Sequence, residues 1–460
     1  MIDVAVIGAG ITGLTVAYEL TRRGKSVIVL EASPRAGGLI RTERADGFTI
    51  EAGPDSLLVS KPAGLDLVRE LGLDAQVVRV RTPGAFVLRG RRLHRLPSPS
   101  LLGLPLTWRA LAGYGLLPWT ARVRLAMEPR IAARASSQDE AVASFFRRRF
   151  GRHTVDLIAQ PLLGGIHAGD IEQLSMQSLF PRLIELERSQ GSVLGAKGTA
   201  AFLRERRGQP PSSPFVSLRG GMQTLVDALI GALPPGTVRF DSPVHQLTRL
   251  TGSWRLFGDG ASHLSEARTV VLAAPAHAAA RLLRPIDAQA ADLCARVPYV
   301  STASVALAWP RSAVAHPLDG TGFVVARRHS SARITAATWV SAKWEARAPE
   351  NAVLVRAFLG GQHDPGVVDL PDDEMVEQVR RDLEMVMGIA APPSLARVFR
   401  WTNAGAQHTV GHLQRVDEID ARLRAVGGIL AAGSGFRSVG IPDCIADARR
   451  VAAAAAAKSE

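Results

Sequence analysis

The chain has 460 residues, of which 47% are hydrophobic and 21% are charged, as in an ordinary globular protein with a sizeable core and two or three lobes. Its two cysteines, Cys294 and Cys444, exclude a disulfide framework and favour a reducing compartment. The net charge of +13 comes mostly from arginine, but aromatic residues are sparse and no nucleic-acid-binding motif is present, so we expect no nucleic-acid partner. Anionic lipid, a polycarboxylate substrate and a merely solvated arginine-rich surface all remain open as explanations of the charge.

The first residues of the chain carry its strongest pattern. Residues 2–7 form an apolar run with the length of a buried parallel strand, and a second such run, 26–30, closes on Glu31. A glycine turn and a helical segment lie between them, as in a dinucleotide-binding unit. The first glycine makes the tight turn, the second lets a pyrophosphate approach, and the third lets the helix pack on the strand. These glycines are Gly8, Gly10 and Gly13, and we expect Glu31 to bind a ribose.

A second glycine cluster narrows the cofactor. Residues 34–42 place Gly37-Gly38 soon after Glu31, and residues 47–55 end in Gly53-Pro54-Asp55. NAD enzymes usually pass from the acid into the next helix. Flavoproteins of the amine-oxidase-like superfamily instead continue with a double-glycine segment that wraps FAD, and the chain resembles them here.

Periodicity and turn residues predict the rest of the elements in order. We expect a helix at 65–73, a hairpin with a basic turn at 85–95, helices at 138–150 and 153–163, a Gly-rich break at 162–170 and a linker at 206–214. A helix should follow at 222–229, with strands at 238–240, 244–247 and 269–275, strands of a second sheet at 300–309 and 352–360, and a helix at 372–387. The chain should close on a strand at 428–432 and a helix that starts near Ile441 and frays in its alanine tract.

The stretch 96–121 differs from the rest of the chain. It mixes leucines, Trp108, Tyr114 and Trp119 with arginines and prolines, and no uncharged run reaches the roughly 20 residues that span a bilayer. One interpretation is an interfacial surface that dips into one leaflet. The alternative is a buried loop or channel lid.

Several motifs together resemble the porphyrinogen oxidases of haem synthesis, which are FAD-dependent enzymes that use oxygen and act on protoporphyrinogen IX or coproporphyrinogen III. The resemblance covers nearly the whole chain. It implies three flavin cycles, each passing a hydride from a meso carbon to flavin N5, with the protein supplying orientation and electrostatics. The motifs are 8–13, 37–42, 51–58, 165–170, 411–412 and 439–445, of which 53–57 and 439–444 are the most specific.

The resemblance implies an α/β fold class with a split Rossmann-like FAD domain, an α+β substrate domain and a mainly helical membrane-docking domain. The FAD domain would take residues 1–80, 210–280 and 425–460. The substrate domain would take 81–95 and 281–424, and the helical domain 96–209. Because the first strand begins at residue 2, we expect no signal peptide and a cytoplasmic location, with peripheral contact at the inner face of the membrane. The oligomeric state, monomer or dimer, stays open.

The resemblance also implies the residues of the site, with FAD as cofactor, a porphyrinogen as substrate, oxygen as acceptor and no metal. Gly164 and Gly165 would face the substrate pyrroles, while Phe323, beside Gly322, together with Ile334 and Phe358 would pack against the ring. The flavin-binding set would be Gly8, Gly10, Ile11, Thr12, Gly13, Glu31, Ala32, Gly37, Gly38, Leu39, Arg41, Gly53, Pro54, Asp55, Ser56, Val244, Ala274, Trp401, Gly433, Val439, Gly440 and Ile441.

Two departures from the family pattern bear on the substrate. Ala85 stands where plant-type members carry a propionate-anchoring arginine, and His167 replaces a frequent tyrosine. The absence of that arginine favours assignment to the bacterial branch of the family, which uses coproporphyrinogen. Rival interpretations are an amine oxidase or carotenoid desaturase of the same superfamily, and a non-enzymatic binding protein of the same fold. Lys343 is expected on the surface, and His412 is expected to be structural rather than an acid or base.

Overall fold

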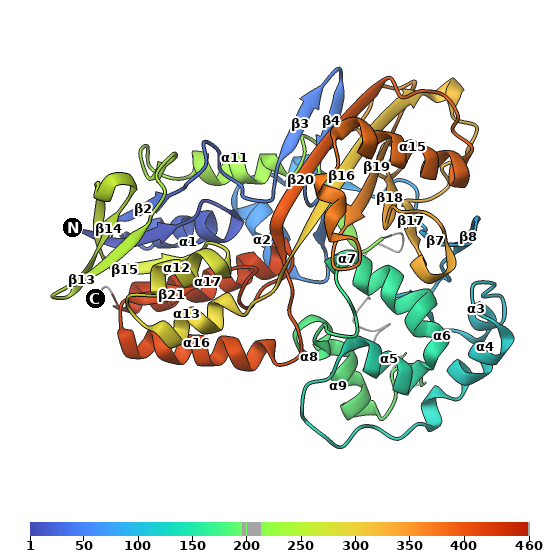
Figure 1. Cartoon of the computed structure of the whole chain (residues 1–460), viewed down its shortest axis with the longest axis horizontal. Helices are drawn as coiled ribbons and strands as arrows, with labels where there is room; N and C mark the ends of the chain where they lie inside the picture. The colour runs from blue at the N-terminus through green and yellow to red at the C-terminus, as the bar shows by residue number, and fades with distance from the viewer. Residues whose placement is uncertain (196–198, 200–212, 459–460) are drawn as a thin grey trace.

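The computed structural model describes residues 1–195, 199 and 213–458. It forms three lobes (Figure 1): a cofactor lobe that contains both chain ends, a lobe built on a second sheet, and a helical lobe beneath the second sheet. The linker expected at 206–214 lies outside the described residues as far as residue 212.

The cofactor lobe is built on a seven-stranded sheet whose centre is parallel. Its central strands read as nearly continuous apolar runs because helices cover both faces. The parallel strands are β1 (Ile2–Ile7), β2 (Val27–Leu30), β12 (Val238–Arg239), β15 (His263–Leu272) and β21 (Ile429–Ala431), and β13 (Gln246–Leu250) and β14 (Ser253–Phe257) add an antiparallel hairpin. One strand is thus contributed by the last part of the chain, next to strands from the first part and the middle.

Two sets of helices cover this sheet. One set shares a hydrophobic core with one face of the sheet: α1 (Ile11–Thr21), α2 (Pro62–Glu70), α11 (Gln223–Gly231) and α17 (Ile441–Lys458). The other set packs in a second core: α12 (Ala276–Leu283), α13 (Ala288–Ala295) and α16 (His412–Val426). The alanine tract does not fray as expected, because α17 continues to Lys458 and the side chains of Ala452 and Ala455 are fully buried.

The second lobe contains a seven-stranded mixed sheet that is covered on one face by α15 (Asp372–Met387). In spatial order its strands are β20 (Leu395–Ala406), β16 (Tyr299–Pro310), β19 (Ala352–Gly360), β18 (Ala336–Trp339), β17 (Gly322–Val325), β7 (Phe86–Arg89) and β8 (Arg92–Arg95). The short α14 (Val340–Lys343) follows β18. The expected hairpin at 85–95 is confirmed as β7 and β8.

Smaller sheets join the lobes. β3 (Thr42–Ala45) and β4 (Phe48–Glu51) form a hairpin, and β11 (Phe215–Leu218) pairs with both β5 (Leu57–Leu58) and β6 (Val77–Arg79). A core cluster that includes Ile50, Ala306 and Leu354 packs this region against the second sheet. The segment after β4 is therefore fixed between the cofactor lobe and the second sheet.

The helical lobe has its own core of phenylalanine and leucine side chains. Its elements are β9 (Ser100–Leu101), β10 (Leu104–Pro105), α3 (Trp108–Ala112), α4 (Trp119–Ala126), α5 (Val142–Phe150), α6 (Arg152–Thr154), a π-helix (Val155–Gly164), α7 (Gly165–His167), α8 (Met176–Leu179) and α9 (Pro181–Gln190). In the part of the chain that the structure describes, no helix is long and apolar enough to cross a bilayer.

The residues of the 96–121 stretch are divided between the interior and the surface of the helical lobe. Tyr114 and most leucines of the stretch are buried in the helical core and the other leucines pack against that core, whereas the side chains of Trp108 and Trp119 are 76% and 73% exposed. The buried leucines lie in β9, β10 and the connecting loops, whereas Trp108 and Trp119 are the first residues of α3 and α4. The hydrophobic pattern alone does not separate the two groups, because both are apolar residues close together in the sequence.

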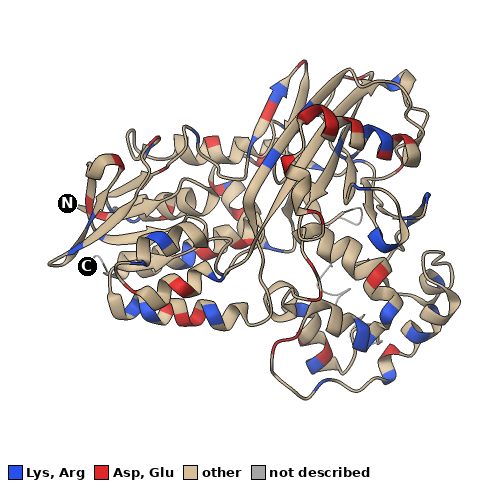
Figure 2. Ribbon diagram, viewed as in Figure 1, with Lys and Arg blue, Asp and Glu red and all other residues tan. Residues whose placement is uncertain are grey.

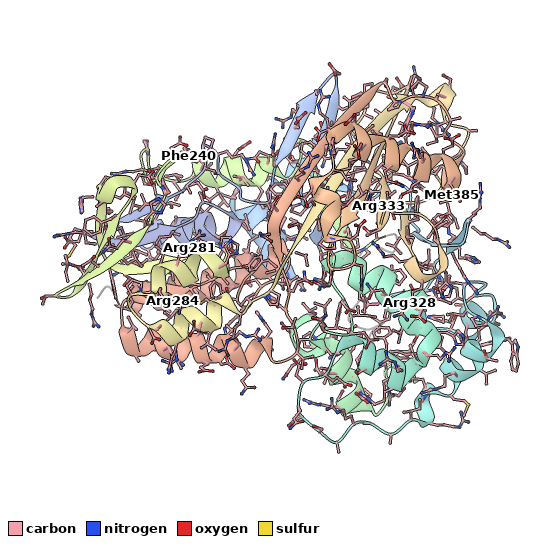
Figure 3. All side chains as sticks on the ribbon, viewed as in Figure 1. Phe240, Arg281, Arg284, Arg328, Arg333 and Met385 are labelled. Carbon is pink, nitrogen blue, oxygen red and sulfur yellow. The ribbon has the colours of Figure 1, made fainter. Side chains whose placement is uncertain are left out.

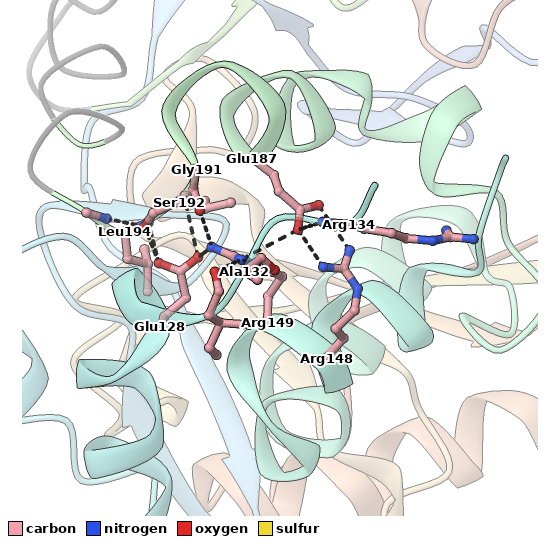
Figure 4. Close-up of polar contacts among 12 residues, drawn as sticks. Glu128, Ala132, Arg134, Arg148, Arg149, Glu187, Gly191, Ser192 and Leu194 are labelled. Atoms are coloured by element: carbon pink, nitrogen blue, oxygen red, sulfur yellow. Dashed lines mark hydrogen bonds and ion pairs between the residues drawn. The ribbon is translucent and has the colours of Figure 1, made fainter. Parts of the chain in front are cut away.

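A buried ion-pair cluster stabilises the helical lobe (Figure 4). Arg149 pairs with Glu128, and the side chains of both residues are fully buried. Glu128 also accepts hydrogen bonds from the backbone N–H groups of Val193 and Leu194, at 3.1 and 3.0 Å. The Arg149 guanidinium donates to Ile131 O at 2.7 Å through Nη1, so both of its terminal nitrogens have partners, while Nε has none among the described residues.

The polypeptide passes between the cofactor lobe and the second lobe at other residues than the sequence suggested. Boundaries at 281 and 425 would place α13 and α16 in the substrate domain, but both helices pack in the core of the cofactor sheet. The polypeptide instead enters the second sheet at Tyr299, where β16 begins, and leaves it at Ala406, where β20 ends. The sequences of α13 and α16 contain no pattern that indicates which of the two sheets these helices cover.

Candidate flavin and substrate site

The carboxyl ends of the parallel strands meet along one edge of the cofactor sheet. Because β1, β2, β15 and β21 run in the same direction, the segments that follow them converge there. These segments contain most of the flavin-binding residues expected from the sequence. Gly10 forms an isolated bridge with Gly37, and a Cβ atom on Gly433 would lie 3.4 Å from Thr12 Oγ1.

The glycine turn after β1 leaves space that a phosphate can occupy. Gly8 has a φ of +106°, and a Cβ there would lie 2.8 Å from Ala273 O, so only glycine fits. A Cβ on Gly13 would overlap Gly8 O. A Cβ on Gly10 would meet nothing within 4 Å, so this position opens onto free space. The three positions therefore have the properties that a pyrophosphate-binding turn needs.

The N-terminus of α1 is available to an anion. Gly10 is its N-cap, no side chain caps the helix, and its first turn contains no acidic residue. The first backbone N–H groups of an α-helix have no partner inside the helix, and the helix dipole adds positive charge at this end. Ile11, Thr12 and Gly13 are thus placed to bind phosphate oxygens.

Glu31 links the turns on either side of it. Its carboxylate accepts hydrogen bonds from Ala9 N at 2.7 Å and from Ser33 N at 2.9 Å. Each carboxylate oxygen has a second lone pair, so these bonds leave acceptor capacity for a ribose hydroxyl. Ala32 follows directly, and Val244 lies close by because Ser242 N donates to Glu31 O at 2.8 Å.

The double-glycine segment is held against the first turn. Gly37 N donates to Ala9 O at 2.8 Å, and a Cβ on Gly38 would lie 3.3 Å from the Gly10 Cα. The Arg35 guanidinium donates to Ile40 O and Gly38 O at 3.1 and 2.6 Å. The side chains of Leu39 and Arg41 remain largely exposed at this edge.

The segment after β4 is clamped by the second sheet. Arg356 Nη1 donates to Glu51 O at 2.6 Å and to Gly53 O at 2.8 Å. Trp401 Nε1 donates to Ala52 O at 2.9 Å. Three successive carbonyl groups therefore point at the sheet, which fixes Gly53 and the Pro54-Asp55-Ser56 run that follows it. Sequence reasoning missed Arg356, although an arginine inside an apolar strand is itself an anomaly.

Asp55 lies in a buried group of charges. Its carboxylate is 2.8 Å from Lys343 Nζ and 3.8 Å from Arg356 Nη2, and it accepts a hydrogen bond from Trp344 Nε1 at 3.2 Å. Burial alone would raise the pKa of Asp55, but Lys343 and Arg356 outweigh it and hold the pKa well below its ordinary value. The expectation that Lys343 lies on the surface is wrong, because its side chain is only 13% exposed and is paired with Asp55.

Glu51 is the second buried acid of this region. Its carboxylate accepts hydrogen bonds from Met222 N and Thr42 Oγ1, both at 2.8 Å, and lies 3.4 Å from Arg347 Nη2. Burial raises the pKa of Glu51, which Arg347 offsets in part. Glu51 thereby joins the β3–β4 hairpin to the start of α11.

The last segment that the sequence predicts to bind the flavin follows β21. Gly433 N donates to Asp447 Oδ2 at 3.1 Å, and Gly440 N donates to Asp443 Oδ2 at 3.2 Å. Val439 and Gly440 are partly exposed immediately before α17 begins at Ile441. Ala274 follows β15 at the same edge of the sheet.

The expected substrate-facing residues do not all lie together. Gly165 is partly exposed and a Cβ on it would meet nothing within 4 Å, whereas a Cβ on Gly164 would overlap Gln160. Phe323 and Ile334 are 3% and 0% exposed and belong to the core beneath α15. They therefore pack in the lobe's interior rather than with Gly165.

Phe358 lies on the other face of the second sheet. Residues alternate along β19, so Val355, Ala357 and Leu359 face α15, while Arg356 and Phe358 face the cofactor segment. The Arg356 guanidinium lies 4.7 Å from the centre of the Phe358 ring. Ile166, which sequence reasoning did not select, presents a side chain that is 69% exposed next to Gly165.

Two further residues are those that depart from the family pattern. His167 is half-buried with its ring 5.9 Å from that of Phe180, and burial lowers its pKa to about 4. Its imidazole is therefore neutral near pH 7. Ala85 lies just before β7 and accepts a backbone hydrogen bond from Leu96 N.

Comparison with known proteins agrees with this geometry. A family model described as flavin containing amine oxidoreductase matches residues 11–456. The chain belongs to the flavin-containing amine oxidoreductase family. Coproporphyrinogen III oxidase of Bacillus subtilis is 36% identical, with 96% of this chain and 95% of that protein covered. Coproporphyrinogen III oxidase of Propionibacterium freudenreichii is 35% identical, with 97% and 89% covered.

A solved structure shows the same fold over the full length. A protein of Exiguobacterium sp. 255-15 named as a protoporphyrinogen oxidase superposes with a TM-score of 0.87 at 30% identity, covering 99% of this chain and 98% of that one. The α/β fold with a Rossmann-like parallel core is therefore that of the family, and FAD is the cofactor that membership implies. The open position at Gly10 and the uncapped N-terminus of α1 fit this cofactor.

Proposed function

We propose that the protein is an FAD-dependent porphyrinogen oxidase of haem synthesis, which oxidises coproporphyrinogen III or protoporphyrinogen IX to the porphyrin with oxygen as acceptor. The observation that carries the proposal is the end-to-end similarity to coproporphyrinogen III oxidases at 35–36% identity. The converging glycine segments and the uncapped start of α1 support the flavin half of it.

The residues of this chain would bind the cofactor and the substrate and orient them toward each other. When bound, FAD supplies the two-electron acceptor for each oxidation step. Gly10, Ile11, Thr12 and Gly13 would bind the pyrophosphate, and Glu31 a ribose hydroxyl. Segments 37–41, 53–56 and 433–441, with Trp401, Val244 and Ala274, would line the rest of the cofactor.

The substrate would lie between the turn at Gly165 and the face of the second sheet that carries Phe358. Gly165 allows close approach of a flat macrocycle, and the exposed Ile166 side chain offers it an apolar contact. We assign no side-chain base, because the pyrrole nitrogens of the substrate can themselves release the protons. Neutral His167 is suited to a hydrogen bond rather than to a charge on this wall.

Coproporphyrinogen III is the substrate we favour. The two curated relatives described above carry that name, and Ala85 supplies no cation where plant-type enzymes anchor a propionate. A substrate with four carboxylates also suits a protein with a net charge of +13.

The deciding experiment is turnover of coproporphyrinogen III and protoporphyrinogen IX side by side under oxygen, followed by porphyrin fluorescence. We expect both to exceed autoxidation and the former to have the higher kcat/KM. No rate above autoxidation with either would reject the proposal in favour of an amine oxidase, a carotenoid desaturase or a binding protein. Purified protein that takes up no flavin would leave only the binding protein.

We also propose peripheral membrane contact through the helical lobe. Trp108 and Trp119 are largely exposed on the short helices α3 and α4, and Figure 2 shows basic residues along the helices of this lobe. Tryptophan beside arginine suits the interface of an anionic membrane.

Co-sedimentation with phosphatidylglycerol vesicles tests this contact. We expect the double variant Trp108→Ser/Trp119→Ser to lower the bound fraction at least threefold. The matched control is Phe240→Ser, which alters an exposed aromatic side chain on the cofactor lobe (Figure 3) and should leave binding unchanged. Equal binding of wild type and double variant would reject membrane contact through α3 and α4.

A further inference from the structure

One segment touches both halves of the proposed site. Residues 407–412, here called the strap, leave β20 and enter α16, passing between the helical lobe and the cofactor lobe (Figure 1). Thr409 forms an antiparallel bridge with Leu174, and Ser175 N donates to His408 O at 2.8 Å. Gly411 N donates to Asp139 Oδ2 at 3.0 Å. The strap is therefore fixed along its length to the helical lobe.

Gln407 connects the strap to the turn that would face the substrate. Its side chain is 4% exposed, and its Nε2 donates to His167 O at 2.9 Å. Its Oε1 lies so close to Gly169 that a Cβ there would overlap it. The next carbonyl, Ala168 O, accepts from Gln362 N at 2.8 Å. Gln407 is thus the side chain of the strap that holds the Gly165 turn, together with the backbone bond from Gln362.

His408 and His412 connect the strap to the last flavin-binding segment. His408 Nε2 is 2.9 Å from Ser434 O, and His412 Nε2 is 2.6 Å from Phe436 O. The two rings are stacked with centroids 3.8 Å apart and planes 15° apart. Both side chains are at most 1% exposed. The carbonyls they hold lie just before Val439 and Gly440.

The tautomer of His408 follows from its partners. A carbonyl oxygen only accepts, so the proton must be on Nε2, and Nδ1 then accepts from Ser178 Oγ at 2.8 Å. Burial lowers the pKa of both histidines, that of His412 to about 3. The pair is neutral at physiological pH, so two stacked rings carry no mutual repulsion.

We propose that Gln407 and His408 are positioning residues that set the spacing between the substrate-facing turn, 165–169, and the flavin-binding segment, 433–441. Neighbouring side chains of an extended chain point to opposite sides. The single peptide unit between Gln407 and His408 therefore joins the turn on one side to the flavin-binding segment on the other. Movement of either side is transmitted to the other through one fixed strap. The substrate half of this inference rests on the proposed function, whereas the flavin half does not.

The first test measures flavin affinity, by titrating FAD into the apoprotein and following tryptophan fluorescence. His408→Phe keeps an aromatic ring but loses both hydrogen bonds, of which only the one to Ser434 O reaches the flavin-binding segment. We expect its Kd for FAD to rise about tenfold, the effect of losing that one buried hydrogen bond. His408→Gln retains an N–H donor and should restore the Kd to within threefold of wild type. The matched control is His316→Phe, which alters a half-buried histidine whose ring is tilted against that of Trp339, with centroids 4.8 Å apart, away from the strap; it should leave the Kd for FAD unchanged.

The second test separates positioning from general loosening, by anaerobic reduction of the flavin with coproporphyrinogen III. In holoenzyme His408→Phe, the saturating reduction rate should fall at least tenfold while the half-saturating concentration changes less than threefold. Gln407→Ala should instead raise the half-saturating concentration and leave the Kd for FAD within twofold of wild type. A merely structural role would not produce this split.

The outcomes are distinguishable. A His408→Phe variant whose FAD affinity and reduction rate stay within twofold of wild type overturns the inference. Should that variant fail to fold, Ser178→Ala removes only the partner of Nδ1 and should weaken FAD about threefold, and no shift overturns the inference equally. Wild-type protein that binds FAD but is reduced by neither porphyrinogen refutes the proposed function, while the FAD titration still tests the strap.

Discussion

At the scale of single residues, the site depends on glycines, whose lack of a side chain leaves room for the cofactor, and on a few polar side chains that donate hydrogen bonds to carbonyl groups. The glycines could be predicted from the sequence because their spacing between two strands has one physical explanation. Arg356, Gln407 and His408 could not, because the carbonyls they hold lie in segments distant along the chain. Their importance depends on folded contacts rather than on local pattern.

The first prediction separates two glycines of the same turn. Gly10→Ala places its methyl group in free space at a φ of −69°, so its unfolding free energy should change by less than about 1 kcal/mol while its Kd for FAD rises at least tenfold. Gly13→Ala overlaps Gly8 O and should destabilise the protein itself by roughly 1–3 kcal/mol. Urea unfolding of the apoprotein and FAD titration measure the two effects. Gly231→Ala, whose methyl group would also be free of contacts, is the control and should alter neither.

The second prediction concerns pH and His412. Burial first, and then neighbouring His408, lower the pKa of His412 to about 3, with Arg415 and Arg437 adding to the effect. The unfolded chain has a histidine pKa near 6.5, so it binds more protons than the native state between these values. Stability is therefore present above pH 6.5 and is lost as the pH falls towards 3.

As the pH falls from 7 to 5, His412 alone should lower the free energy of unfolding by roughly 2 kcal/mol. His412→Gln keeps a donor for Phe436 O but does not titrate, so its stability should fall by that much less over the same interval. Urea midpoints at both pH values give the comparison. Identical pH slopes for the two proteins would contradict the assigned pKa.

At the scale of elements, periodicity predicted the existence of most strands and helices, and their faces were harder to predict. The strand at 352–360 was expected and is β19, but which of its residues face α15 depends on pairing with β16 and β18. That alternation puts Phe358 on the cofactor side, whereas the pairing of β17 and β18 puts Phe323 in the core. A shift of the pairing register by one residue would move each side chain to the opposite face of the sheet. The sequence of a single strand does not determine that register.

The third prediction tests the ion-pair cluster that stabilises the helical lobe. Arg149→Met leaves Glu128 buried without its cation, and breaking such a pair should cost roughly 3–5 kcal/mol of unfolding free energy. Arg147→Met is the matched control on the same helix, because its partner Glu172 is 45% exposed and such pairs contribute less than about 1 kcal/mol. Chemical unfolding monitored by circular dichroism measures both. Similar losses in the two variants would mean that burial does not determine the strength of these pairs.

At the scale of the whole molecule, the two chain ends build one sheet, and this could be predicted because both carry glycine turns beside apolar strands. The pairing of β15 with β1 and with β21 places the turns at one edge. Other long-range relations had no such marker, which is why α13 and α16 were expected in the wrong lobe. Arg328 gives another example, since it reaches Asp156 of the helical lobe at 3.0 Å (Figure 3).

The excess of arginine is also a property of the whole molecule, and part of it is structural. Arg122 donates to Ala112 O, and Arg124 donates to Arg148 O and Arg149 O, so these side chains satisfy helix C-termini. Arg91, Arg92 and Arg109 are exposed and contribute to the field around the protein. A field of this kind raises the association rate of an anionic substrate and is screened by salt.

The fourth prediction follows from this field. Coproporphyrinogen III carries four carboxylates and protoporphyrinogen IX two, so kcat/KM should fall with ionic strength for both and more steeply for the former. Between low salt and physiological salt we expect a loss on the order of fivefold for the tetracarboxylate and about twofold for the dicarboxylate. Initial rates measured with the FAD content verified at each salt concentration distinguish screening from cofactor loss. Equal salt slopes for the two substrates would show that the positive charge does not act on substrate carboxylates, and would leave the membrane surface as the anion that the exposed arginines meet.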